Sequence, residues 1–73
     1  MDDAITARLK KLIYGSGKTY RQLAREIGVP FSTIAGWMNL GKLPDAYNTI
    51  RICQYFHVSA DWLLGLSEKG GIV

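Results

Sequence analysis

The stretch from Thr19 to Asn39 constrains the fold of this 73-residue chain more than any other. Thr19 and Gln22 have the three-residue spacing of a capping box, in which each side chain satisfies an unpaired backbone N–H of the other residue. Gly28 can end such a helix in a left-handed conformation, and Pro30 has a φ suited to the start of another. The stretch therefore predicts two short helices joined by a tight turn.

The apolar residues of this stretch fall on one face of each predicted helix. The spacing of three and four residues places them together on a helical surface. The inward positions are Leu23, Ala24, Ile27, Ile34, Trp37 and Met38. Two short helices with a glycine-containing turn form a helix-turn-helix, and the rest of the chain is expected to support this unit.

A further helix is expected before this unit. It would begin at a cap formed by Asp2 or Asp3 and run to about Tyr14. Its apolar face would consist of Ile5, Leu9, Leu12 and Ile13. The remaining side chains of this helix are mostly polar or charged, as expected for an amphipathic helix with one buried face.

Two more helices are expected after the unit. Asp45 can cap a helix over 46–56, and Ser59 can cap a short fifth helix that ends at Gly65. His57 would occupy the left-handed position between them, where His is one of the few enriched non-glycine residues. The inward side chains of the fourth helix are expected to be Ala46, Ile50, Cys53 and Phe56, with Ile52 alongside. No segment alternates with a period of two, so no sheet is predicted.

The length of the chain indicates one small domain. A chain of this size buries only about 60% of its unfolded surface, which favours a mostly helical bundle. We expect the domain over 1–66 and a flexible tail over 67–73. The single cysteine, Cys53, cannot form an intramolecular disulfide, which fits a reducing cytoplasm. The apolar runs are far shorter than the roughly 20 residues that span a bilayer, so no membrane segment is predicted.

The basic residues are concentrated in the first two thirds of the chain. The net charge of the whole chain is +3, but the span 4–44 holds seven basic residues and one acid, a net +6. Scattered Lys and Arg residues most often form only a solvated surface. Their coincidence with a helix-turn-helix favours a polyanionic partner instead.

Two short motifs each contain only part of a known chemical site. Gly15 to Thr19 reads GSGKT, the second half of a phosphate-binding loop, but the glycine that the full motif requires is replaced by Leu12. Cys53 and His57 are four residues apart, yet no further metal ligands lie nearby in the sequence. We therefore predict no enzyme, no metal site, no cofactor and no small-molecule site.

Three features of the sequence occur together in a fixed order. The twenty-residue unit from Tyr20 has Ala24 at its fifth place, Gly28 at its ninth, Ile34 at its fifteenth and Trp37 at its eighteenth. The segment 37–45 is similar to the run W-E-N-G-K-x-x-P-D, and 57–65 is similar to G-V-S-x-D-W-L-L-G. With these features the chain resembles the Cro/phage-repressor (Xre) class of helix-turn-helix regulators over nearly its whole length.

The resemblance implies an all-α, five-helix, lambda-repressor-like domain that is cytoplasmic, binds double-stranded DNA and works as a homodimer. The helix over 31–38 would enter the major groove. The implied base or groove contacts are Phe31, Ser32, Ala35 and Gly36. The implied phosphate contacts are Lys18, Thr19, Tyr20, Arg21, Thr33, Asn39, Gly41 and Lys42. The apolar residues Trp62, Leu63 and Leu66 are the expected dimer surface.

The groove-facing set leaves two functions open, because it contains no Arg, Gln or Asn to make bidentate base contacts. In the first, the protein is a sequence-specific transcriptional regulator, a repressor that occupies a palindromic operator. It would use phosphate contacts, Ser32, methyl contacts and DNA shape. In the second, the bare face binds protein, and the domain is an adaptor or an antitoxin-like partner. The fold alone does not decide between them.

Overall fold

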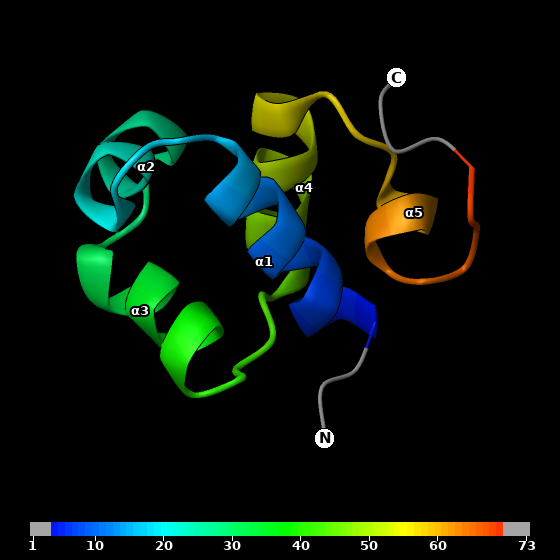
Figure 1. The fold of residues 1–73 in the computed structure, drawn as a ribbon, viewed down its shortest axis with the longest axis horizontal. Helices are drawn as coiled ribbons and strands as arrows, with labels where there is room; N and C mark the ends of the chain where they lie inside the picture. The colour runs from blue at the N-terminus through cyan, green and yellow to red at the C-terminus, as the bar shows by residue number, and fades with distance from the viewer. Residues whose placement is uncertain (1–3, 70–73) are drawn as a thin grey trace.

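The computed structural model describes residues 4–69, and these residues form five helices and no strand. The helices are α1 (Ala4–Gly15), α2 (Tyr20–Ile27), α3 (Phe31–Asn39), α4 (Ala46–Phe56) and α5 (Ala60–Leu63). Helix α1 crosses in front of α4, with α2 and α3 on one side of this pair and α5 on the other (Figure 1). The all-α, five-helix prediction is confirmed. The predicted cap at Asp2 or Asp3 and the glycines at 70 and 71 lie outside the described residues.

The local signals that define the helix ends are confirmed. The Thr19 hydroxyl accepts from the backbone N–H of Gln22 at 3.1 Å, and the Gln22 side chain accepts from the Thr19 N–H at 2.9 Å. Gly28 ends α2 with φ 92°, and His57 ends α4 with φ 57°, both left-handed. Asp45 caps α4 through the N–H of Asn48 at 2.8 Å. These contacts are all local, which is why the sequence alone could predict them.

The core lies where the five helices meet. The large side chains that are almost completely buried are Leu9, Ile13, Leu23, Ile34, Ile52 and Leu63. The predicted inward faces of α2 and α3 are confirmed, because all six of their side chains are buried. In α1 the buried face shifts slightly, since Thr6 is buried whereas Ile5 and Leu12 pack only partly against the core.

The predicted inward face of α4 is wrong in two positions. Ala46 is exposed and Ile50 is 54% exposed, whereas Thr49 and Ile52 are buried. The Thr49 hydroxyl donates to the carbonyl of Asp45 at 2.8 Å, so its polar group is satisfied within the helix and the side chain can face the core. A pattern that counts threonine as polar therefore favours a face that is rotated by about one residue, roughly 100°, from the buried one.

Residues 67 and 68, which follow α5, are attached to α1. The Arg8 guanidinium donates to the backbone carbonyls of Trp62 and of Ser67, and the distance to Ser67 is 2.8 Å. It also pairs with Glu68 at 3.4 Å and lies over the Trp62 ring, 5.0 Å from its centre. Arg8 therefore joins the first helix to the end of the fold. None of the described helices has the length and apolar character needed to cross a membrane.

Candidate nucleic-acid interface

Helix α3 is anchored by one face and leaves the start of the other face open. Ile34, Trp37 and Met38 are buried in the core, which fixes the rotation of the helix about its axis. Phe31 is 41% exposed and Ser32 is also exposed. The open surface is thus formed by the first turn of α3, the part of a recognition helix that reaches base edges.

Two predicted groove residues are less open than expected. Ala35 is half-buried and Gly36 is buried. A Cβ atom on Gly36 would lie 3.3 Å from Cδ of Lys42, so the aliphatic part of that lysine crosses α3 at this point. The backbone N–H groups of Leu40 and Lys42 both donate to the Gly36 carbonyl at 3.1 Å. The space beside Gly36 is therefore occupied by Lys42 of the same chain.

The loop after α3 forms one flank of the candidate interface. Asn39, Gly41 and Lys42 are exposed, and Gly41 turns the chain with φ 68°. A hollow of about 450 Å³ between this loop and the start of α3 is lined by Ser32, Thr33 and Lys42, among others. The structure therefore places Ser32 and Thr33 of α3 and Lys42 of the loop around one hollow.

The start of α2 forms the other flank. The Arg21 guanidinium lies over the Phe31 ring, 4.6 Å from its centre. A hydrogen bond to Tyr14 raises the pKa of Tyr20, so this phenol is neutral at physiological pH and keeps its proton. Thr19 is exposed, but its hydroxyl already accepts the capping bond. The stacking of Arg21 on Phe31 spans ten residues and a turn, and nothing in the sequence pattern indicates it.

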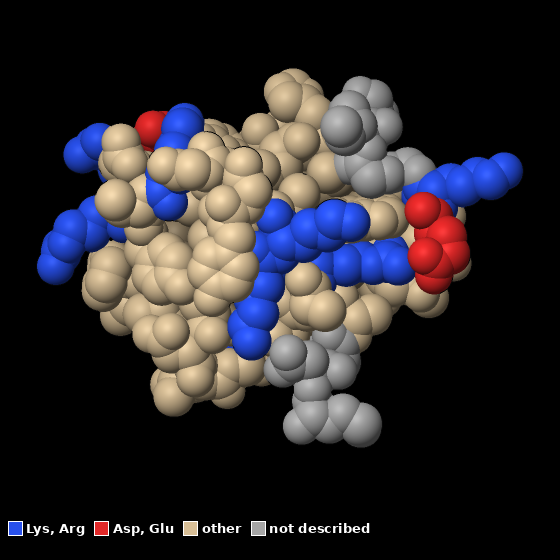
Figure 2. Space-filling view, in the orientation of Figure 1, with Lys and Arg blue, Asp and Glu red and all other residues tan. Residues whose placement is uncertain are grey.

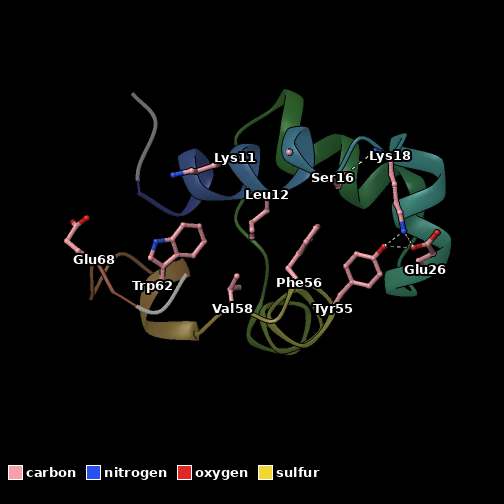
Figure 3. Close-up of a pocket in the computed structure, with 11 residues that line it drawn as sticks. Lys11, Leu12, Ser16, Lys18, Glu26, Tyr55, Phe56, Val58, Trp62 and Glu68 are labelled. Atoms are coloured by element: carbon pink, nitrogen blue, oxygen red, sulfur yellow. Dashed lines mark hydrogen bonds and ion pairs between the residues drawn. The ribbon is translucent and has the colours of Figure 1, made fainter. Parts of the chain in front are cut away.

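Lys18 is not the unpaired cation that the sequence suggested. Its ammonium donates to Oε1 of Glu26 at 2.6 Å and to the Tyr55 hydroxyl at 2.9 Å, and the Tyr55 hydroxyl donates to the same carboxylate oxygen. This Lys18 cluster lies at one end of a groove of about 840 Å³ whose apolar lining includes Leu12 and Phe56 (Figure 3). One of the seven basic residues of the +6 span is therefore neutralised by the span's single acid.

The Lys18 cluster predicts a pH dependence of stability. The hydrogen bond from Lys18 lowers the pKa of Glu26, and the hydrogen bond to Glu26 raises the pKa of Lys18. The contribution of the Glu26 carboxylate is therefore complete above its usual pKa of 4.5 and is lost as the pH falls through its lowered folded value. That of the Lys18 ammonium is complete below its usual pKa of 10.5 and is lost as the pH rises through its raised folded value.

We accordingly expect Glu26→Gln to be less stable than the parent chain at about pH 7 and nearly equal to it at about pH 3. Urea denaturation at both values, followed by tryptophan fluorescence, measures the difference. Because both groups are exposed, the effect is small and decreases further with added salt. A stability difference that is the same at both pH values would contradict the role of the Glu26 charge.

The charge distribution differs between the flanks and α3 itself. In Figure 2 the Lys and Arg side chains gather over α1 and around α2, whereas most of the visible surface over α3 is uncharged. Such an arrangement attracts a polyanion to the surroundings of α3.

The predicted dimer residues separate into different environments. Leu63 is 0% exposed and belongs to the core, so its side chain is not available to a second copy and the prediction for this residue is wrong. Trp62 is half-buried against Arg8. Leu66 is 75% exposed and Leu64 is 39% exposed, so these two leucines remain as accessible apolar side chains at this end of the fold.

The cysteine and histidine set aside in the sequence do not form a site. Burial raises the pKa of the Cys53 thiol, which disfavours a reactive thiolate. Within residues 4–69, no three side chains of His, Cys, Asp or Glu come together as potential metal ligands.

Comparison with known proteins assigns the chain to a family. A model of the helix-turn-helix family matches residues 9–63, which covers α2, α3, α4 and α5 entirely and most of α1. Searches of curated proteins and of solved structures returned no match. The matched family is one of DNA-binding domains and not of enzymes. The chain belongs to the Cro/C1-type (Xre) helix-turn-helix family, and its partner is DNA.

Proposed function

We propose that this protein is a sequence-specific transcriptional regulator, a cytoplasmic repressor that acts by occupying a palindromic operator with α3 in the major groove. The observation that carries the proposal is the anchoring of α3. One face is fixed by Ile34 and Trp37, while Phe31 and Ser32 at its start are exposed between two basic or polar flanks. A recognition helix needs this combination of a rigid base and an open first turn.

The two flanks would contact the phosphates on either side of the groove. At the start of α2, the unpaired N–H groups of the first turn can donate to a phosphate. The Tyr20 hydroxyl can donate to the same phosphate when its proton turns away from Tyr14. On the other side, Asn39, Gly41 and Lys42 lie on one exposed loop, with Thr33 beside it. Such contacts position the protein on the duplex without reading sequence.

We further propose that the protein binds its operator as a homodimer. A single domain with few base contacts binds weakly, and two copies on one face of the DNA raise the effective affinity. They would occupy half-sites about one helical turn apart. The exposed Leu66, together with Leu64 and the accessible part of Trp62, supports a dimer contact at the α5 end.

A second candidate function is a protein-binding adaptor or an antitoxin-like module. It is favoured by one observation, the exposed Phe31 ring at the start of α3. The basic surroundings of α3 favour DNA.

A fluorescence anisotropy titration with mixed-sequence duplex DNA at two salt concentrations separates the candidates. We expect micromolar or tighter binding that weakens steeply as the salt concentration rises, because each phosphate contact releases counterions. Absence of binding at low salt would exclude the regulator and leave the adaptor.

Lys42→Ala is expected to weaken binding to every DNA sequence alike and to reduce the slope of log affinity against log salt by about one unit. Lys18→Ala is expected to change that slope less, because Glu26 already neutralises the Lys18 ammonium. Anisotropy titrations with two unrelated duplexes over a range of salt concentrations measure both effects. A changed preference between the duplexes would contradict a phosphate role for either lysine.

A further inference from the structure

We infer that Arg21, held over the ring of Phe31, is the base-reading side chain of this protein, and that the pair recognises a guanine next to a thymine in each half-site. The inference rests on the proposed function. It changes the role of Arg21 from a phosphate contact to a determinant of sequence specificity, and it supplies the bidentate base contact that the exposed first turn of α3 lacks.

The first step is that α3 does not carry such a contact. Its exposed first turn offers the Phe31 ring and the Ser32 hydroxyl, and a single hydroxyl pairs with several bases. Side chains that discriminate strongly do so with two parallel hydrogen bonds, as Arg does with O6 and N7 of guanine. A sequence-specific reader on this scaffold therefore has to come from a neighbouring element.

The second step is that the Arg21 guanidinium is held by the Phe31 ring while its N–H donors stay available. Its centre lies 4.6 Å from the centre of the Phe31 ring, within the range of a cation–π contact. Within the part of the chain that the structure describes, this guanidinium makes no hydrogen bond and no ion pair, so all five of its N–H donors are available.

Three other basic side chains use their N–H donors in hydrogen bonds or ion pairs with protein groups. Arg8 binds the carbonyl of Ser67 and the Glu68 carboxylate, and Arg51 donates to the Gly28 carbonyl at 2.6 Å. Lys18 is held by Glu26. Arg21 is distinguished by a contact that restricts its rotamers while leaving its polar edge open, which lowers the entropy lost when it binds.

The third step concerns depth in the groove. Phe31 is the first residue of α3, and the first residues of a recognition helix lie against base edges. A guanidinium stacked on that ring lies at the level of the bases rather than at the phosphate wall. The exposed part of the ring can contact the C5-methyl group of thymine. The apolar ring and the forked donor beside it thus match a thymine methyl beside the O6 and N7 acceptors of guanine.

The test compares three variants of the full chain: Arg21→Lys, Phe31→Leu and, as a matched control, Arg25→Lys. Arg25 is also an exposed arginine of α2, but its guanidinium lies over no aromatic ring of residues 4–69. Each substitution in α2 keeps the positive charge, so the electrostatic attraction to DNA is preserved. Selection from randomised duplexes first gives the site preferred by the parent protein, and anisotropy then measures binding to that site and to mixed-sequence DNA.

We expect the selected half-site to contain a thymine next to a guanine. Arg21→Lys should lose roughly 5- to 150-fold in affinity for that site while its binding to mixed-sequence DNA is nearly unchanged, because lysine is a point charge and not a fork. Replacing the guanine by 7-deazaguanine, which lacks N7, should weaken the parent protein more than Arg21→Lys. Replacing the thymine by uracil should weaken the parent protein more than Phe31→Leu, whose smaller side chain makes less contact with the methyl group. Arg25→Lys should behave as the parent protein does.

Two results would overturn the inference while leaving the proposed function intact. One is salt-dependent binding to mixed-sequence DNA with no guanine preference in the selection. The other is an Arg21→Lys variant that keeps the parent preference or weakens all sequences equally, as a phosphate contact would. If the parent protein binds no duplex at low salt, both the inference and the proposed function fall. Circular dichroism confirms that each variant is folded before binding is compared.

Discussion

Leu63→Asp is expected to be unfolded at 25 °C, whereas Leu66→Asp is expected to keep the native fold. Leu63 is 0% exposed in the middle of the core, while Leu66, three residues later, is 75% exposed. Truncating a buried leucine costs about 2–5 kcal/mol, and burying an unpaired carboxylate adds to this cost. The total stability of a small domain is expected near the low end of about 5–15 kcal/mol.

Circular dichroism and urea denaturation measure the effect of the two substitutions on the fold. The same pair tests the proposed dimer, because Leu66→Asp should sediment as a lighter species than the parent chain if Leu66 lies at the contact. An unchanged mass in the folded Leu66→Asp variant would exclude that contact. A native spectrum and an unchanged denaturation midpoint for Leu63→Asp would contradict the placement of Leu63 in the core.

Gly65→Ala is expected to destabilise the domain more than Gly17→Ala, although both glycines have left-handed backbone conformations. Gly65 has φ 81° and Gly17 has φ 72°. Each alanine pays the cost of this conformation, about 1–2 kcal/mol. At Gly65 the added Cβ would also lie 2.7 Å from Cβ of Ala4, whereas at Gly17 it meets nothing within 4 Å.

The close contact at Gly65 forces α5 and the start of α1 apart. Overpacking of this kind typically costs a further 1–3 kcal/mol or so. Urea denaturation of the two variants against the parent chain isolates the steric part, because the conformational cost is common to both. Equal losses of stability would show that α1 and α5 adjust freely and that the contact with Ala4 does not constrain the fold.

The helix-turn-helix was predictable because its signals are local. The capping box of Thr19 and Gln22, the left-handed Gly28 and the burial of Ile34 and Trp37 all act within a few residues along the chain. The unusual left-handed His57 was predictable for the same reason, since the helix end requires that conformation whatever surrounds it.

The sequence predictions of buried residues were wrong where a local pattern was compatible with two arrangements. In α4, both the Ala46–Ile50 stripe and the Thr49–Ile52 stripe are compatible with an amphipathic helix. The choice depends on which stripe fits against the other helices, and Thr49 can be buried because its hydroxyl is satisfied by the Asp45 carbonyl. Near the C-terminus, apolar composition alone could not separate the buried Leu63 from the exposed Leu66.

The candidate interface also depends partly on local sequence signals and partly on tertiary contacts. The sequence by itself determined the frame that orients α3, and with it the predicted place of DNA, because that frame is encoded in short-range spacing and caps. It also determined that the predicted groove positions 31, 32, 35 and 36 carry no Arg, Gln or Asn to form two hydrogen bonds to a base. Only the tertiary structure decided which charges remain available, because an ion pair or a ring contact depends on residues that folding brings together. Folding neutralises Lys18 with Glu26 and Tyr55, lays Lys42 across Gly36 and stacks Arg21 on Phe31.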